Sequence, residues 1–253
     1  MVEVSSKAII GKNTNIKAFS VVEDDVIIGD NVDIGPSAFI GNGSRISNNV
    51  KILHAATIST WPSSLGYMEE ESTTEIGEGT IIKAHATVCR GTKSRMRTVI
   101  GKNCYIMNHA HVAHDNIIGD NTIITNAANL GGHVIVGNNT NVGGMVAVHQ
   151  FVHIGDYVMI EGGMKVDKDV PHYALAGRMP LRFIGINFIG LKRKGFSPEQ
   201  INEIKEAYKI IYNSGLNVSD ALKKLKDDME MTERVKNIYD FISESERGII
   251  RNA

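Results

Sequence analysis

The chain has 253 residues, a formal net charge of −1 and two cysteines. This length allows one large domain, or a large one joined to a small one. A charge near zero excludes the basic surface typical of nucleic-acid binding, and two cysteines are too few for a disulfide framework, so we expect a reduced, cytoplasmic setting. No apolar run is long enough to span a bilayer and no signal peptide opens the sequence, so we expect neither stable membrane insertion nor export.

A six-residue repeat begins at Val4 and continues to Pro171. Each hexad opens with an aliphatic residue, as in IGKNCY from position 100, and twelve hexads run from there without a slip. A period of six fits neither a helical stripe nor simple alternation, and indicates a hexapeptide β-helix. Three hexads should form one triangular coil, with coils about 4.8 Å apart. We expect the aliphatic residues to point inward and Gly, Asn and Asp to occupy the corners, because these residues tolerate positive φ.

Two interruptions break the repeat. The first spans residues 59–75, contains the only tryptophan, and combines Pro, Gly and clustered Glu, which marks a loop protruding from the prism. Long excursions from a regular fold usually serve a function, although an idle surface loop is the alternative. The second is a basic stretch with Lys93, Arg95 and Arg97. The opening residues on either side of each interruption, Ile58 and Ile76 for the first and Val88 and Ile100 for the second, are separated by a multiple of six residues. The repeat therefore keeps its phase.

The C-terminal part has a different pattern. We assign residues 1–171 to the β-helix and residues 172–253 to a connector, up to position 195, and a small helical domain. The sequence SPEQ from position 197 is a capping box with proline at the first helical position. This helix should end at Gly215, and two more should begin at Ser219 and at Thr232. We expect them to cover the open end of the β-helix, which would otherwise expose strand edges.

The repeat also predicts which side chains meet. Residues three hexads apart should lie directly above one another, which places His114, Gly132 and Gln150 in one column and Asp115 and His133 in the next. Six of the nine histidines fall between positions 109 and 153. We therefore interpret this edge of the prism as the chemical site.

The residues of this edge suit acid–base chemistry. A histidine beside a carboxylate can act as a general base, because its ordinary pKa is near neutrality and the carboxylate fixes its tautomer. The backbone N–H of Gly132 could approach a developing oxyanion closely. No serine or cysteine nucleophile stands in these columns. Direct transfer to an acceptor, with His114 removing its proton, is therefore favoured over a covalent intermediate.

Two other interpretations stay open. Three imidazoles from adjacent subunits could hold zinc with an open coordination position, as in a β-helix zinc enzyme of the carbonic anhydrase type, although His111, His114, His133 and His149 form no evident ligand triplet. The chain could also be a structural solenoid without activity. The crowding of histidines and the long loop argue against that alternative.

Several longer motifs stand together in this chain: NHAHVAHD at 108–115, LGGH at 130–133, AVHQF at 147–151, DVP at 169–171, GLKRKGFS at 190–197 and RGIIR at 247–251. Together they resemble the UDP-N-acetylglucosamine O-acyltransferases of lipid A biosynthesis, over essentially the whole chain. The resemblance implies a homotrimer of left-handed β-helices with active sites between subunits. It also implies transfer of a 3-hydroxyacyl group from acyl carrier protein to the glucosamine 3-position of the UDP-sugar, with no cofactor beyond the thioester donor.

The same resemblance assigns roles to individual residues. His114 becomes the general base, Asp115 its orienting partner, and the N–H of Gly132 the donor to the thioester oxyanion. A glycine at position 162 leaves the acyl groove open for a long chain. The substrate-binding positions implied are His111, His133, His149 and Gln150 for the pocket, Gly162 for the acyl chain, and Asn187, Arg193 and Lys194 for the nucleotide.

The protruding loop departs from the family pattern. Members commonly read Gln-Asp-Leu near the acceptor, where this chain has Ser63, Ser64 and Leu65, followed by Tyr67. Some members form an amide on a 3-amino analogue, so the acceptor stays open between UDP-N-acetylglucosamine, this analogue and another sugar nucleotide. The basic stretch at 93–97 could meet the acidic carrier protein, a solvated loop being the alternative. The acyl-chain length also stays open.

Overall fold

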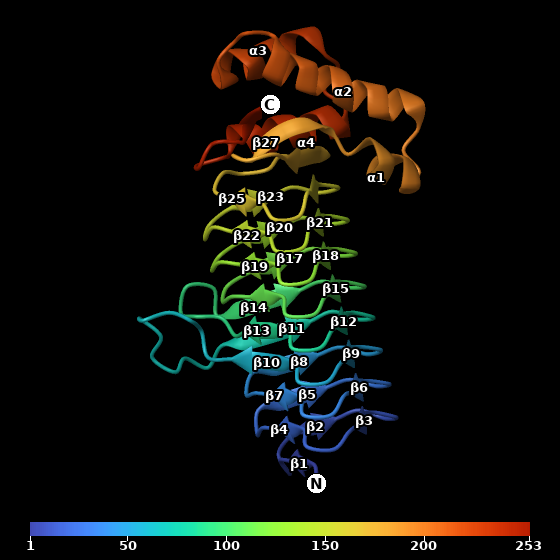
Figure 1. Ribbon diagram of the computed structural model, residues 1–253, viewed down its shortest axis with the longest axis vertical. Helices are drawn as coiled ribbons and strands as arrows, with labels where there is room; N and C mark the ends of the chain where they lie inside the picture. The colour runs from blue at the N-terminus through green and yellow to red at the C-terminus, as the bar shows by residue number, and fades with distance from the viewer.

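Short strands recur regularly along the hexads in the computed structural model, which describes residues 1–253. They stack into three sheets along a tall prism, with the N-terminus at one end and the helices at the other (Figure 1). The first sheet contains β1 (Glu3–Val4), β4 (Val21–Val22), β7 (Phe39–Ile40), β10 (Thr57–Thr60), β13 (Thr87–Cys89), β16 (His111–Val112), β19 (Asn129–Leu130), β22 (Ala147–Val148) and β25 (Lys165–Val166).

The other two sheets are built in the same way. The second contains β2 (Ile9–Ile10), β5 (Val26–Ile28), β8 (Ser44–Ile46), β11 (Thr73–Ile76), β14 (Arg97–Ile100), β17 (Ile117–Ile118), β20 (Ile135–Val136) and β23 (His153–Ile154). The third contains β3 (Asn15–Ile16), β6 (Asp33–Ile34), β9 (Lys51–Ile52), β12 (Ile81–Ile82), β15 (Tyr105–Ile106), β18 (Ile123–Ile124), β21 (Asn141–Val142), β24 (Met159–Ile160), β26 (Ala174–Gly177), β27 (Arg182–Ile186) and β28 (Arg251–Asn252).

The strand register confirms the predicted columns. Val112 pairs in parallel with Leu130, which is three hexads further along the chain. Across the first interruption Ile52 pairs with Ile82, so that this coil is longer by two hexads. Across the second interruption Val88 pairs with Val112, so that this coil is longer by one hexad. Both insertions are whole hexads, and the columns therefore stay aligned.

The aliphatic residues that open the hexads form the interior, as predicted, from Val22 onward, whereas Val4 and Ile10 of the first coil are exposed at the N-terminal end of the prism. Ile34, Ile58, Ile82 and Ile124 are fully buried in one core that continues into the helical cap. Burial of each such side chain stabilises the fold by about 1.5–3 kcal/mol. Successive coils repeat this layer of aliphatic side chains. We attribute the straight shape of the prism to that repetition.

The corners differ from the prediction. Positive φ occurs at matching corner positions in successive coils, but it is adopted by His109 and Phe151 as well as by Asn121. The glycines at the second place of the hexad do not have positive φ. A Cβ atom on Gly101 would instead lie 2.4 Å from Oδ1 of Asp120 in the next coil. These glycines are required because neighbouring coils approach closely there.

Both excursions leave the prism at one corner, between the first and second sheets. Strands β10 and β11 extend into the range predicted as the first loop, so the protruding segment is 61–72 rather than 59–75. The second excursion covers residues 90–96, between β13 and β14. Since His114 lies in the turn between β16 and β17, both loops belong to the predicted chemical edge.

Residues 172–195 are not the simple connector that the sequence predicted. Strand β26 continues the third sheet beside β24, and β27 and β28 extend it further. The short helix α1 (Phe188–Arg193) follows, with Asn187 as its N-cap. The sequence does not predict this helix, because so short a segment carries no measurable apolar period.

The three predicted helices are present. Helix α2 (Pro198–Asn213) has the predicted capping box of Ser197 and Gln200. Helix α3 (Val218–Asp228) begins one residue earlier than predicted, because Asn217 is its cap, and α4 (Glu233–Ser243) begins after Thr232 as predicted. The helices cover the C-terminal end of the prism (Figure 1). None of them is both long enough and apolar enough to cross a membrane.

Candidate active site

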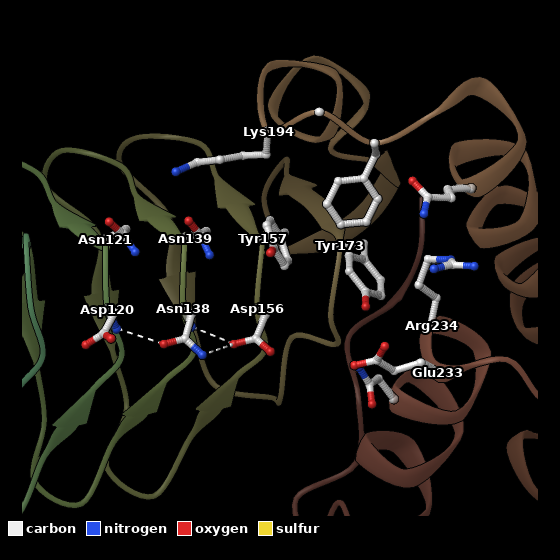
Figure 2. Close-up of a pocket in the computed structure, with 14 residues that line it drawn as sticks. Asp120, Asn121, Asn138, Asn139, Asp156, Tyr157, Tyr173, Lys194, Glu233 and Arg234 are labelled. Atoms are coloured by element: carbon white, nitrogen blue, oxygen red, sulfur yellow. Dashed lines mark hydrogen bonds between the residues drawn. The ribbon is translucent and has the colours of Figure 1, made fainter.

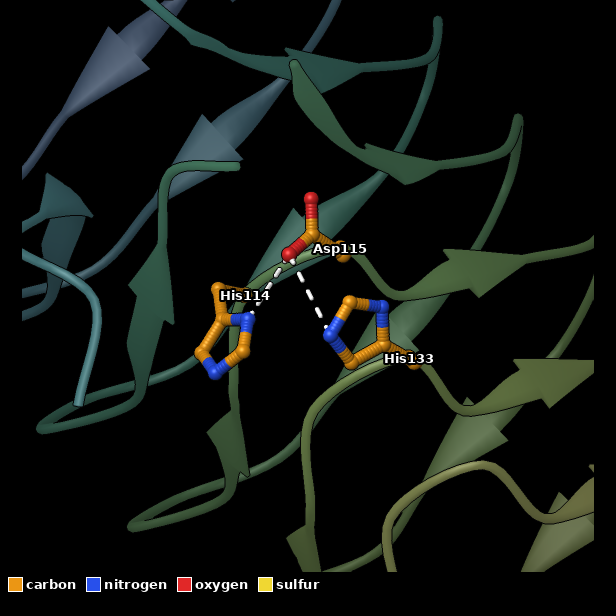
Figure 3. A group of neighbouring side chains, drawn as sticks. All are labelled: His114, Asp115 and His133. Atoms are coloured by element: carbon orange, nitrogen blue, oxygen red, sulfur yellow. Dashed lines mark hydrogen bonds and ion pairs between the residues drawn. The ribbon is translucent and has the colours of Figure 1, made fainter. Parts of the chain in front are cut away.

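The corner between β16 and β17 carries a histidine–aspartate pair. Nδ1 of His114 lies 2.8 Å from Oδ2 of Asp115 (Figure 3). Asp115 is fully buried, while the side chain of His114 is 13% exposed. An ionised carboxylate only accepts hydrogen bonds, so Nδ1 carries the proton and Nε2 of the neutral ring is left as an acceptor. This is the arrangement that a general base requires.

The surroundings keep Asp115 ionised. Burial alone would raise its pKa, but hydrogen bonds from Thr92 and His114 outweigh burial and hold the pKa below the ordinary value of an aspartate. The carboxylate is therefore charged at neutral pH. It fixes the orientation of the imidazole and stabilises the ring once the ring takes up a proton.

A second imidazole lies beside the pair. Nε2 of His133 is 3.7 Å from Oδ2 of Asp115, and its ring meets that of His114 edge-on, with centroids 5.1 Å apart (Figure 3). His133 also stacks on Phe151, with ring centroids 4.5 Å apart. Burial lowers the pKa of His133, so this ring is neutral at pH 7. Sequence reasoning missed Phe151 as a site residue, although its position three hexads after His133 would have identified it.

Gly132 has a steric role that the sequence did not reveal. A Cβ atom at this position would lie 2.6 Å from Cε1 and 2.8 Å from Nε2 of His114. Any larger residue would therefore displace the ring. The backbone N–H of Gly132 donates to no backbone group of this chain, so it is also free to meet an oxyanion.

Three further predicted residues lie near this corner. His111 is on β16, and burial lowers its pKa. His149 and Gln150 are exposed in the turn after β22. Nδ1 of His149 lies 3.4 Å from a guanidinium nitrogen of Arg247, which the sequence analysis did not propose as a site residue. The RGIIR motif was the available signal.

The protruding loop 61–72 also leaves from this corner, and Figure 1 shows it extending away from the prism. Tyr67 packs edge-on against Trp61 within the loop, and Ser63 is exposed. Two large apolar side chains, Leu65 and Met68, are almost completely exposed. Within one chain, nothing covers the tip of this loop.

Gly162 lies on a different corner from His114, in the turn between β24 and β25. A Cβ atom there would be 3.1 Å from the carbonyl oxygen of Gly144, so even alanine would be tight. The structure of one chain therefore does not bring the predicted acyl position and the predicted base to the same edge.

The predicted nucleotide residues are also remote from His114 along the chain's own surface. The side chain of Asn187 caps α1 through the N–H of Gly190 and donates to the carbonyl of Tyr157. Arg193 is exposed at the end of α1. Lys194 lines a polar cavity of about 620 Å³ at the corner between the second and third sheets, where its side chain extends over Asn121 and Asn139 (Figure 2).

The zinc alternative has a partial ligand set. Ligand atoms of His114, Asp115 and His133 lie within 4.8 Å of one another, whereas His111 and His149 stand outside this group. Both oxygens of Asp115 already accept hydrogen bonds from protein groups. Proton transfer by His114 leaves these hydrogen bonds to Asp115 intact, whereas coordination of a metal by Asp115 would break some of them. Both cysteines are buried and free.

Comparison with known proteins gives consistent matches. A family model described as "Udp N-acetylglucosamine O-acyltransferase; Domain 2" matches residues 169–250, and the bacterial transferase hexapeptide model matches residues 7–42. The acyl-[acyl-carrier-protein]–UDP-N-acetylglucosamine O-acyltransferase of Syntrophobacter fumaroxidans is 40% identical, over 98% of this chain and 97% of that protein. Its counterpart from Campylobacter concisus is 36% identical, over 97% and 94%.

Solved structures agree with these matches. The UDP-N-acetylglucosamine acyltransferase of Bacteroides fragilis superposes with a TM-score of 0.97 at 44% identity, over 99% of this chain and 98% of that one. The Francisella novicida enzyme gives 0.96 at 33% identity, over 99% and 92%. With the three sheets, whose strands are parallel except for the β26–β27 pair, these matches identify the fold as a left-handed parallel β-helix.

Proposed function

The chain belongs to the UDP-N-acetylglucosamine O-acyltransferase family, and from this premise we propose that it catalyses the first step of lipid A biosynthesis. It transfers a 3-hydroxyacyl chain from acyl carrier protein to the glucosamine 3-oxygen of UDP-N-acetylglucosamine. The observation that carries the proposal is the His114–Asp115 pair, in which the ionised carboxylate holds Nδ1 and leaves Nε2 as the acceptor.

The reaction follows from this geometry. Nε2 of His114 takes the proton of the sugar 3-hydroxyl while the hydroxyl oxygen attacks the carbonyl carbon of the thioester. The N–H of Gly132 stabilises the resulting oxyanion. When the C–S bond breaks, the departing sulfur receives the proton from Nε2, and the ester and the free carrier thiol result. Such general-base assistance contributes about 10²–10⁴ to the rate.

The remaining residues bind the substrates. In the proposal His111, His133, His149 and Gln150 line the pocket, and His133 contributes a neutral ring beside the charged pair. Asn187, Arg193 and Lys194 hold the nucleotide, and Gly162 leaves room for a long acyl chain. No metal or cofactor takes part, because the free acceptor at Nε2 and a thioester donor suffice for the transfer.

A homotrimer would unite the dispersed residues. Gly162, Lys194 and His114 lie on three different corners of one prism, so packing corner against corner between copies is the direct way to bring them together. The uncovered apolar tip of loop 61–72 supports such packing. Light scattering should report three copies per particle; an active monomer would contradict a shared site. We place the enzyme in the cytoplasm, where acyl carrier protein and reduced thiols are available.

The acceptor is tested by incubating purified protein with 3-hydroxyacyl carrier protein and either UDP-N-acetylglucosamine or its 3-amino analogue. Mass spectrometry should detect an ester on the first acceptor. Amide formed only on the second would mean that the altered loop at Ser63 and Ser64 has changed the acceptor. Absence of product from both would refute the proposed function.

A further inference from the structure

We propose that Thr92 is a positioning residue for the transfer, which acts by clamping Asp115 so that the His114 ring faces the acceptor. This inference rests on the proposed function and extends it to the second excursion, residues 90–96. That excursion adds one hexad to its coil, and its purpose is not evident from the repeat.

Thr92 contacts both oxygens of the Asp115 carboxylate. Its Oγ1–H donates to Oδ2 at 2.7 Å, and its backbone N–H donates to Oδ1 at 3.0 Å. The N–H of Arg95 adds a weaker bond to Oδ1 at 3.2 Å. Thr92 is buried, so water cannot readily replace these donors. Since His114 bonds the same Oδ2, Thr92 fixes the oxygen that orients the base.

The backbone of Asp115 is held from two further sides. Its N–H donates to Oγ1 of Thr98 at 2.9 Å, and a guanidinium nitrogen of Arg95 donates to its carbonyl at 2.8 Å. Its φ of 60° recurs at the matching corner residues His133 and Phe151 of the next two coils, so this left-handed conformation belongs to the β-helix turn itself. Thr98 and Arg95 therefore hold the backbone of Asp115 in place at a turn that the fold already forms.

The clamp is also joined to the protruding loop 61–72. Oγ of Ser72 donates to the carbonyl of Gly91 at 2.5 Å, and two guanidinium nitrogens of Arg90 donate to the carbonyl of Ser72. Hydrogen bonds thus join the end of the loop to Arg90 and Gly91, and the next residue, Thr92, bonds Asp115, which in turn bonds His114. Both excursions at this corner converge on the base.

Few charged and titratable groups surround the His114–Asp115 pair. They are His133, Arg95, whose guanidinium contacts the Asp115 carbonyl, and His111, whose pKa is lowered by burial and by His114. Arg97 lies 3.8 Å from Glu75 and Lys93 is exposed, so neither contacts the pair. Without the Thr92 hydroxyl, Oδ2 of Asp115 would accept a hydrogen bond from His114 alone. The carboxylate would then stabilise the protonated His114 ring more strongly.

The test compares Thr92→Val with Thr92→Ser and with Thr122→Val. Thr122 is also a buried threonine, but it lies on another corner, where its hydroxyl donates to the carbonyl of Gly137. We expect Thr92→Val to lower kcat at least about tenfold, with KM for the UDP-sugar within about twofold. The acid limb of the kcat/KM profile should move to higher pH. Thr92→Ser should restore both values, and Thr122→Val should leave both unchanged.

The outcomes separate this inference from the proposed function. Wild-type kcat and an unmoved acid limb in folded Thr92→Val would overturn the positioning role while leaving the transferase function standing. Equal loss in Thr92→Ser, which keeps the hydroxyl, would also overturn it. If the valine variant does not fold, Thr92→Ala replaces it in the comparison with serine. A wild-type protein without product would refute the proposed function and this inference together.

Discussion

Replacement of Gly132 by alanine tests the position of the base directly. The added methyl would lie 2.6 Å from Cε1 of His114, whereas carbon atoms in contact prefer about 3.5–4.0 Å. To reach that separation the ring must retreat by about 1 Å. A displacement of this size in a catalytic group lowers the rate by about 10²-fold, so we expect kcat/KM of Gly132→Ala to fall by about that factor while the melting temperature shows a folded protein.

A double-mutant cycle identifies the cause. If the methyl acts by displacing His114, then adding Gly132→Ala to a His114→Ala background should cost little further activity, because the displaced ring is already gone. Rates of ester formation would be followed by mass spectrometry for all four proteins. Full activity of the single glycine variant would refute the geometry. An equal loss in both backgrounds would show that the methyl acts elsewhere, for example at the oxyanion.

Three further predictions concern other parts of the account. A bulky Gly162→Met side chain should shift the preferred donor to shorter acyl chains in a competition between carrier proteins, and unchanged selectivity would remove Gly162 from the acyl groove. The lowered pKa of Asp115 implies stability that is present above the ordinary aspartate pKa of about 3.9 and is lost as pH falls further. Asp115→Asn should therefore flatten the acid side of the melting-temperature profile; an unchanged slope would contradict this. Dialysis against a chelator should leave the rate unchanged, whereas a loss restored by zinc would favour the metal alternative.

The β-helix could be predicted from the sequence because its period is local and repeated. One aliphatic residue in six, buried from the second coil onward, fixes the register, and the register alone brought Asp115 and His133 together although they belong to successive coils. The capping box of α2 is likewise a local signal, and Ser197 caps the helix as predicted.

The missed features depend on contacts between segments that the period does not describe. Thr92 lies in an insertion, so no column predicted that it would meet Asp115. The steric need for Gly132 arises from the ring of His114 in the preceding coil. The third sheet continues past Pro171 because β26 pairs with β24. No aliphatic hexad marks this continuation in the sequence. Pairing between backbones requires no particular side chain, so it leaves little trace in the sequence.

The central claim is that His114 removes the proton of the sugar 3-hydroxyl. The most direct test measures single-turnover ester formation from 3-hydroxyacyl carrier protein and UDP-N-acetylglucosamine by wild-type protein and by His114→Ala. We predict product on the 3-oxygen for the wild type and a rate about 10²–10⁴ lower for the variant, with the same melting temperature. A His114→Ala variant that turns over at the wild-type rate would contradict the account.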